Sequence, residues 1–81
     1  MNDTPTYAKA MLSAREKAGL KQKDMAMLAG VHVNTLRRYE KGLLVPTIPV
    51  AEALADVLGL TIDEYVGHVR TKRKELPEWT L

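Results

Sequence analysis

QKDMAMLAGVHVNTLRRYEKG, residues 22–42, is the stretch of sequence that decides the fold. The apolar residues of its first eight positions share one face of a helix, and they are Met25, Ala26, Leu28 and Ala29. Gly30 follows, and glycine adopts without a steric penalty the left-handed conformation that ends a helix abruptly. The pattern therefore predicts a helix over residues 22–29 and a tight turn after it.

A second helix is predicted directly after the turn, over residues 33–41. Its apolar residues Val33, Leu36 and Tyr39 fall on one face. The opposite face carries polar and basic residues, namely Asn34, Arg37, Arg38 and Lys41. One face is thus expected to pack while the other presents hydrogen-bond donors. Ala26 is small where two steeply crossing helices bring their backbones together, so a larger side chain there is expected to push them apart.

These two helices describe a helix-turn-helix, and the residues around them resemble a known family. The segments that carry the resemblance are 20–22 (LKQ), 25–26 (MA), 29–31 (AGV), 34–36 (NTL) and 39–42 (YEKG). They are similar to the DNA-binding domain of the phage repressor and Cro family, which includes the xenobiotic-response-element regulators, over residues 7–66. The resemblance implies an all-α fold, a compact five-helix, lambda-repressor-like domain over residues 1–66 with a short C-terminal extension over 67–81.

The resemblance also implies which residues read DNA bases in the major groove. They lie at the start of the motif's second helix and one to two turns along it, and here they are Val33, Asn34, Arg37 and Arg38. Arginine can donate two hydrogen bonds to guanine, asparagine can pair with adenine, and valine can contact the thymine methyl group. Arg37 is expected either to read a base or to hold a phosphate. Composition alone favours ordinary surface arginines, but their place on the outward face favours a DNA role.

Contacts to the DNA phosphates are expected from residues near the ends of the two helices. They are Lys21, Gln22, Lys23, His32, Thr35 and Lys41. Lys21 stands where the family usually has a serine or threonine cap, and we hypothesise that a phosphate supplies the missing acceptors at that helix N-terminus. His32 departs from the family in the same way, and its imidazole could cap the helix, contact a phosphate or be solvated.

Five residues are expected to have structural roles in the motif: Arg15, Ala26, Gly30, Leu36 and Glu40. The resemblance implies an ion pair between Arg15 and Glu40 that ties the first helix to the third. A surface pair of small energetic value is an equal alternative.

The other helices are predicted from caps and apolar stripes. The first ends near Ala18, before Gly19, and has Asp3 or Thr4 as its cap and Pro5 in its first turn. Its core residues are expected to be Tyr7, Met11, Ala14 and Ala18.

The fourth helix is predicted to follow Thr47 as its cap, to have Pro49 in its first turn and to end at Gly59. Its buried stripe is expected to comprise Val50, Ala51, Leu54, Ala55 and Leu58. The fifth helix is predicted to open with a capping box of Thr61 and Glu64. The hydrophobic staple predicted there joins Leu60 to Tyr65.

Two apolar segments lie outside these helices. Leu43, Leu44 and Val45 are together too apolar for all of them to be exposed. Beyond Val66 the chain could continue the fifth helix to about Glu75 or form an arm. Its apolar residues Leu76, Trp79 and Leu81 are expected to pack on a second copy of the chain.

Length, composition and charge limit the possible functions. The 81 residues, 46% hydrophobic and 27% charged, suit one small domain. The absence of cysteine excludes disulfides and thiolate metal sites, and no apolar run reaches the roughly 18 residues of a membrane span. We therefore expect a cytoplasmic, nucleoid-associated protein without metal, cofactor or membrane contact. Residues 21–42 carry a net charge of +3, residues 43–69 carry −4 and residues 70–74 carry +4, so one end should attract phosphate.

The sequence thus predicts a transcription regulator, a repressor, that binds double-stranded operator DNA of two-fold symmetry as a homodimer. The alternative is an antitoxin or adaptor whose main partner is another protein, held through the C-terminal tail. An enzyme is disfavoured because there is no cysteine or phosphate-binding loop, and His32 and His68 lack a carboxylate or serine at dyad spacing. RNA binding is disfavoured because a helix fits the DNA major groove better than the deep, narrow groove of RNA.

Overall fold

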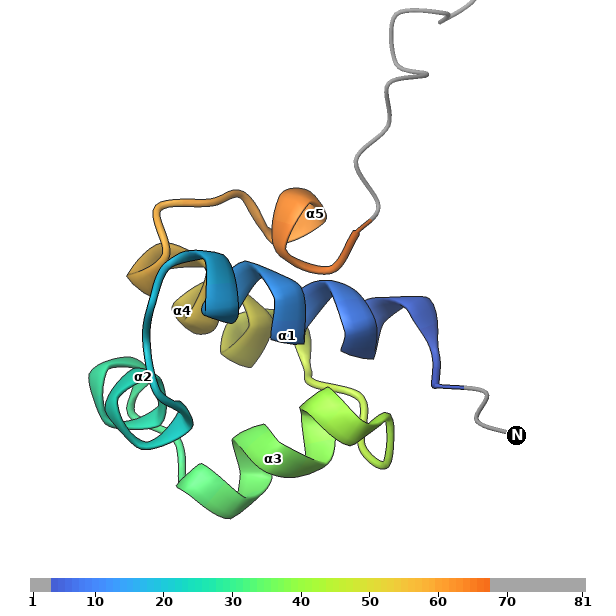
Figure 1. The fold of residues 1–81 in the computed structure, drawn as a ribbon, viewed down its shortest axis with the longest axis horizontal. Helices are drawn as coiled ribbons and strands as arrows, with labels where there is room; N and C mark the ends of the chain where they lie inside the picture. Colours follow the sequence, from blue (N-terminus) through green and yellow to red (C-terminus); the bar gives the residue numbers. More distant parts are fainter. Residues whose placement is uncertain (1–3, 68–81) are drawn as a thin grey trace, which may run out of the picture.

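The computed structural model describes residues 4–67, which form five α-helices and no strand (Figure 1). In chain order the helices are α1 Thr6–Lys17, α2 Gln22–Ala29, α3 Val33–Lys41, α4 Ile48–Val57 and α5 Ile62–Tyr65. The predicted all-α, five-helix fold is confirmed. Among these residues, no helix is both long and apolar enough to cross a membrane.

Capping residues explain where α4 and α5 begin. The Thr47 hydroxyl accepts a hydrogen bond from the Val50 amide at 3.4 Å, and Pro49 lies in the first turn, as predicted. At α5 the Glu64 amide donates to the Thr61 hydroxyl at 3.1 Å, while the Thr61 amide donates to the Glu64 carboxylate at 2.9 Å. This reciprocal pair is the predicted capping box.

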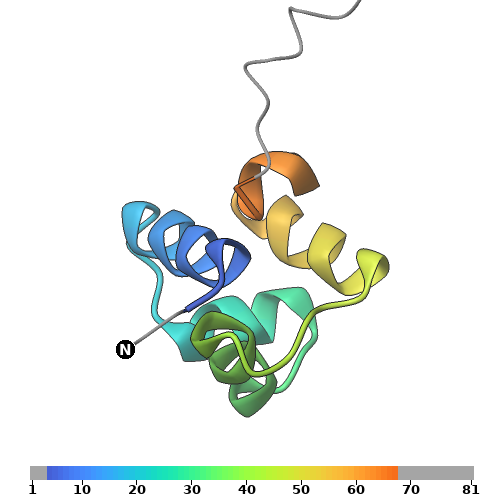
Figure 2. The same cartoon turned by 90° about the vertical axis from the view of Figure 1, so that its right-hand side faces the viewer.

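The core lies where the five helices meet, and each of them contributes to it. α1 packs against α3 and α5, while α2 packs against α3 and α4 (Figures 1 and 2). The buried residues of this cluster are Met11, Met25, Ala26, Leu36, Tyr39, Leu54, Ala55 and Tyr65. Leu60 packs against the same cluster as Tyr65, as the predicted staple requires. Ala26 is only 2% exposed, which fits the need for a small residue at this crossing.

Three details of the helix predictions are wrong. Pro5 is the residue before α1 rather than part of its first turn, and among the described residues no side chain caps that helix. Ala18 is exposed, because Arg15 takes the inward position near the end of α1 and Ala8 is buried at its start. Leu28 is 62% exposed, because α3 and α4 cover only the side of α2 that carries Met25 and Ala26.

The loop after α3 also differs from the prediction, because all three of its apolar residues are exposed. Leu43 and Val45 are each 71% exposed and Leu44 is 41% exposed. Main-chain contacts hold this loop instead of side-chain burial. The Leu43 amide donates to the Arg38 carbonyl at 2.9 Å, and the Tyr7 hydroxyl donates to the Leu44 carbonyl at 3.0 Å.

Of the two alternatives for the chain beyond Val66, an uninterrupted continuation of the fifth helix is not found, because α5 ends at Tyr65. Gly67 follows with φ 79°, a left-handed conformation that a continuing helix does not contain. The expectations about Leu76, Trp79 and Leu81 lie outside the described residues.

Candidate nucleic-acid interface

The turn between α2 and α3 has the left-handed geometry that the presence of Gly30 predicted. Gly30 has φ 76°, in the left-handed region. The Gly30 amide donates to the Met27 carbonyl at 3.2 Å and the Val31 amide to the Ala26 carbonyl at 2.9 Å, so the last carbonyls of α2 are satisfied as the chain reverses. Three residues, 30–32, separate the two helices. This is the tight connection of a helix-turn-helix.

Three of the four predicted base-reading side chains lie on the exposed face of α3. Asn34, Arg37 and Arg38 are exposed, whereas Leu36 on the opposite face is fully buried. Val33, in the first turn of α3, is half-buried. Residues 4–67 therefore leave free the face that a DNA groove would have to meet.

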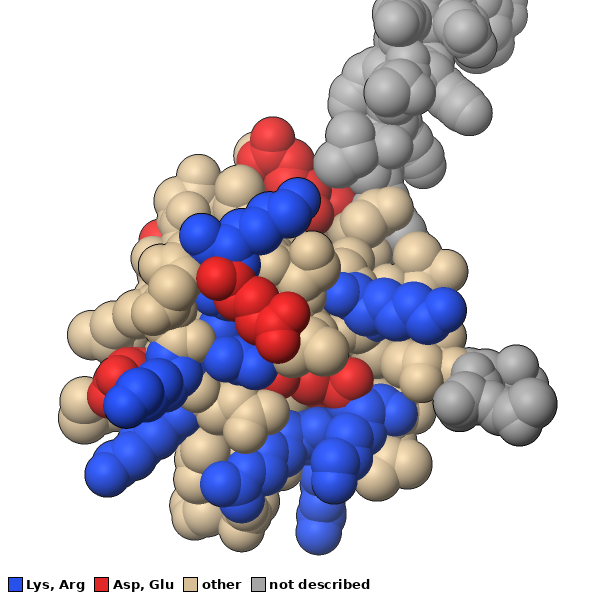
Figure 3. Space-filling model, in the orientation of Figure 1, with Lys and Arg blue, Asp and Glu red and all other residues tan. Residues whose placement is uncertain are grey.

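Charge on the surface is unevenly distributed. Figure 3 shows lysine and arginine side chains gathered in the lower part of the view, where Figure 1 places α2 and α3. Asp and Glu side chains stand at the top, on the side of α5, and others lie in the middle and at the left of the view. Residues 43–67 contain four acidic residues and no Lys or Arg. Among the described residues, a polyanion is therefore attracted to α2 and α3 rather than to α4 and α5.

The predicted phosphate-contacting residues divide into two groups by exposure. Lys21, Lys23, His32 and Lys41 are exposed, whereas Gln22 and Thr35 are half-buried. No side chain of the described residues caps α2 at Lys21, as the missing serine or threonine predicted. The backbone N–H groups in the first turn of α2 therefore remain free to donate hydrogen bonds to an anion.

Of the three alternatives for His32, the structure contains the helix cap. Its Nδ1 accepts a hydrogen bond from the Asn34 amide at 3.0 Å, directly before α3. An accepting Nδ1 places the proton of the neutral ring on Nε2, which remains a donor. The cap and a phosphate contact through Nε2 are thus compatible.

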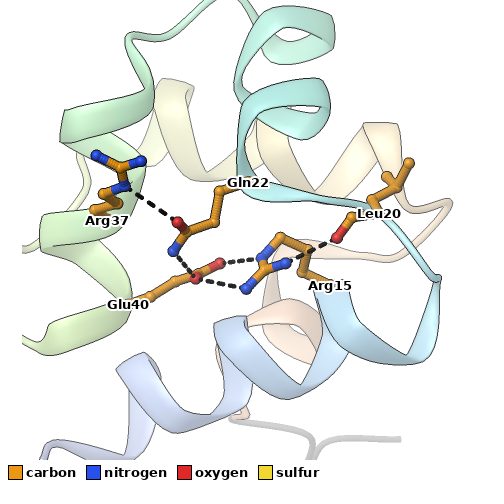
Figure 4. A network of polar contacts seen from close by, with 5 residues as sticks. All are labelled: Arg15, Leu20, Gln22, Arg37 and Glu40. Carbon is orange, nitrogen blue, oxygen red and sulfur yellow. Dashed lines mark hydrogen bonds and ion pairs between the residues drawn. The ribbon is translucent and has the colours of Figure 1, made fainter.

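The ion pair between Arg15 and Glu40 forms, and it is largely buried (Figure 4). Arg15 Nε donates to Glu40 Oε2 at 2.8 Å and Nη2 donates to Oε1 at 3.1 Å. The two side chains are only 11% and 3% exposed, so the alternative of a weak surface pair is wrong. Arg15 Nη1 also donates to the Leu20 carbonyl at 2.8 Å. The hydrogen bond to Glu40 raises the pKa of Arg15 and keeps the guanidinium charged.

Gln22 takes part in a contact that the sequence did not predict. Its Nε2 donates to Glu40 Oε1 at 2.8 Å, and its Oε1 accepts from Arg37 Nε at 3.2 Å (Figure 4). Arg37 Nη1 in turn donates to Asn34 Oδ1 at 2.9 Å. Gln22 and Glu40 are 18 residues apart and lie on different helices, so no helical period in the sequence could have paired them. The phosphate contact predicted for Gln22 stays a prediction.

Other possible ligand sites are few in the described part of the chain. Residues 4–67 contain no group of three or more His, Cys, Asp or Glu side chains that could hold a metal ion. An open groove of about 360 Å³ is lined by residues from α1, the loop after α3, α4 and α5: Tyr7, Val45, Pro46, Ile48, Ala51, Ile62, Asp63 and Val66. Most of its lining is apolar, so it suits apolar side chains better than a charged ligand.

Comparison with known protein families matches residues 11–65 to a family described as helix-turn-helix. The matched region is more than half of the 81 residues and includes α2, the turn and all of α3. No curated protein and no solved structure was found to match the chain.

Proposed function

The chain belongs to the helix-turn-helix family of DNA-binding transcription regulators, of the phage repressor and Cro type, and from this we propose that it is a sequence-specific repressor. It binds a two-fold operator in double-stranded DNA as a homodimer, with α3 in the major groove. The observation that carries the proposal is the exposed polar face of α3 opposite a fully buried Leu36. A cytoplasmic, nucleoid-associated location follows from this activity.

Base reading is assigned to the exposed face of α3. Arg38 donates two hydrogen bonds to a guanine, and Asn34 pairs with an adenine through N6 and N7. Val33, in the first turn of α3, contacts a thymine methyl group. Arg37 lies beside Asn34, to whose Oδ1 it donates.

Phosphate contacts position the protein without reading sequence. The exposed Lys21 and Lys23 flank the uncapped N-terminus of α2, so backbone amides and ammonium groups converge on the same anion. Lys41 occupies the other end of the interface, in the last turn of α3. Thr35 and the Nε2 of His32 supply further donors at the start of α3.

A homodimer is proposed because one module of this size reads too few bases for high affinity. The exposed Leu43, Val45 and Ile48 support association with another chain, since they are 66–71% exposed and near one another in the sequence. Half-sites one helical turn apart, about 34 Å, would then match the two copies of α3. The prediction that Leu76, Trp79 and Leu81 pack on a second copy of the chain is kept as part of this proposal.

The same exposed apolar residues favour a second candidate function, an antitoxin or adaptor whose main partner is a different protein. In that case the groove beside Val45 and Ile48 receives an apolar segment of the partner. A monomer in solution that co-purifies with one stoichiometric protein partner supports the second candidate. A dimer that needs no other protein supports the first.

Selection of bound sequences from random duplex DNA at stated salt tests the proposal. The expected result is a palindromic motif that contains guanine and adenine positions in each half. Asn34→Ala combined with Arg38→Ala should abolish the enrichment. Lys17→Ala, which removes an exposed charge at the end of α1, is the matched control and should preserve the motif. No enriched sequence with the unaltered protein contradicts the proposal.

A further inference from the structure

We propose that Glu40, a buried residue, is a positioning residue for base reading. Through Gln22 and Arg37 it fixes the orientation of the Asn34 side-chain amide, which leaves Nδ2 and one lone pair of Oδ1 for DNA. The inference rests on the proposed function and adds to it a determinant of specificity that does not contact DNA.

The first step is the orientation of the Gln22 amide. A carboxylate can only accept hydrogen bonds and a guanidinium can only donate them. Gln22 lies between one of each, with Nε2 at 2.8 Å from Glu40 Oε1 and Oε1 at 3.2 Å from Arg37 Nε. A flipped amide would face Glu40 with an acceptor and Arg37 with a donor, and both contacts would be lost. The charges on either side therefore permit one orientation only.

The second step carries this orientation to the surface. Arg37 donates from Nε to Gln22 and from Nη1 to Asn34 Oδ1, so a single planar guanidinium joins the two amides. Because Arg37 cannot accept, the Asn34 carbonyl end must face it. The Asn34 Nδ2 group then points away from Arg37, together with the second lone pair of Oδ1.

The third step is that Glu40, at the inner end of this series of hydrogen bonds, is held in place. The Glu40 side chain is 3% exposed and is held by two hydrogen bonds from Arg15, which also binds the Leu20 carbonyl (Figure 4). These hydrogen bonds run from α1 to Glu40 on α3, then to Gln22 on α2 and back to Arg37 on α3, so they also set the position of α2 against α3. Exposed asparagine and arginine side chains without such an anchor would sample several rotamers and lose that freedom on binding.

The consequence at DNA is a preference for adenine at the position that Asn34 reads. Nδ2 donates to N7 of the base, and the free lone pair of Oδ1 accepts from the N6 amino group. Without these hydrogen bonds the Asn34 side-chain amide can flip, which exchanges the positions of its donor and its acceptor at the base. The preference at that one position should then fall, while contacts elsewhere remain.

Gln22→Met tests the inference, because methionine has a similar length but can neither donate to Glu40 nor accept strongly from Arg37. It leaves the Arg15–Glu40 pair intact, so the fold should survive. Asn34→Ala first identifies the base position that Asn34 reads. A good base contact favours the right base over a wrong one by about 5- to 150-fold in affinity. In Gln22→Met this ratio, measured at the position that Asn34 reads, should fall to about twofold or less. Gln22→Met added to Asn34→Ala should cause no further loss at this position.

Lys23→Met is the matched control, because it removes a proposed phosphate contact from the same turn of α2. It should weaken all sequences by one factor and leave every base preference unchanged. In the free protein, the NMR signals of the Asn34 side-chain amide should shift in Gln22→Met and not in Lys23→Met.

Two results overturn the inference while the proposed function stands. One is uniform weakening by Gln22→Met with the adenine preference intact, and the other is an unchanged Asn34 amide signal. Failure of the unaltered protein to select any sequence overturns the proposed function instead, and the base-reading role with it.

Discussion

At the residue scale, Glu40 takes part in more side-chain hydrogen bonds than any other residue of α2 and α3. Its carboxylate accepts three hydrogen bonds, two from Arg15 and one from Gln22, at 2.8–3.1 Å. The hydrogen bonds offset the free-energy cost of removing this carboxylate from water only while all of its donors stay in place. It therefore links stability to the shape of the surface that is proposed to face DNA.

Glu40→Ala should lower the free energy of unfolding by about 3–5 kcal/mol, because it leaves the Arg15 charge buried without its partner. Urea denaturation measures this loss, and DNA binding should weaken in the same variant. Replacement of both Arg15 and Glu40 by methionine should be less destabilising than Glu40→Ala, since no unpaired charge remains. Loss of binding at an unchanged melting temperature would contradict this structural role.

Tyr65 is a second residue with an unusual environment. Its side chain is fully buried, and its hydroxyl finds no hydrogen-bond partner among residues 4–67. Burial, and to a smaller extent the charge of Glu40, raises the pKa of Tyr65 well above its ordinary range. Burial also raises the pKa of Tyr39. Both phenols are therefore held in the neutral form by the fold.

The protein should lose stability as the pH rises above about 10, the pKa of a free tyrosine. The unfolded chain ionises there while the folded one does not, so the stability present below that pH is lost as the pH rises toward the folded pKa values. Tyr65→Phe should reduce this loss and, at pH 7, leave stability unchanged or raise it by up to about 1–3 kcal/mol. Urea unfolding at pH 8 to 11 provides the measurement. A clear loss of stability in Tyr65→Phe at pH 7 would show that the hydroxyl has a partner.

At the element scale, two glycines end the two helices of the motif in the same conformation but in different surroundings. Gly30 and Gly42 have φ 76° and 78°. A Cβ built on Gly30 meets nothing within 4 Å, whereas one on Gly42 would overlap Cδ of Pro5. Their local backbone requirements are the same, so the two sites differ by the packing of the start of α1 on the end of α3.

Gly30→Ala should lower stability by about 1–2 kcal/mol, the penalty of a left-handed alanine. Gly42→Ala should lower it further, because Pro5 must also move. Gly42→Ala combined with Pro5→Ala should recover part of the difference, while Gly30→Ala with Pro5→Ala should not. Thermal or urea unfolding of the four variants gives the comparison. Equal losses in the two single variants would show that the contact with Pro5 is easily relieved.

Element boundaries were predictable because the signals are local. The glycines after α2 and α3 and the threonines before α4 and α5 each act on neighbouring backbone groups, and the helices start and stop within about one residue of them. Which face each helix buries was less predictable. Leu28 and Ala18 fit an apolar stripe, but exposure depends on which neighbouring helix covers that side, and this is not a local property.

At the scale of the whole molecule, the separation of charge should make binding strongly dependent on salt. Lys41→Ala should weaken all sequences similarly and reduce the slope of log K against log salt by about 1, because one phosphate contact is lost. Arg38→Ala should instead lose about 1–3 kcal/mol at the preferred site and relax one base position. Competition titrations at several salt concentrations separate the two. Uniform weakening by both variants would exclude Arg38 as a base reader.

The candidate site was predictable only in part. The outward side of α3 follows from the period of Val33, Leu36 and Tyr39, and the structure exposes that side. The contact of Gln22 with Glu40 depends on two helices meeting, so it could be found only in three dimensions. The exposure of Leu43 and Val45 was missed for a related reason. Hydrophobicity predicts that a residue favours burial, but it does not say whether its own chain provides the cover.

The contact between Pro5 and Gly42 has a practical consequence for anyone who produces this protein. It places the residue before α1 against the end of α3, the helix proposed to enter the major groove. In the proposed binding mode the start of α1 lies near the end of α3 that carries Lys41, a proposed phosphate contact. A polyhistidine or other cationic tag fused ahead of α1 is therefore expected to add its own affinity for the nucleic acid. Binding experiments should therefore use protein from which any amino-terminal fusion has been cleaved.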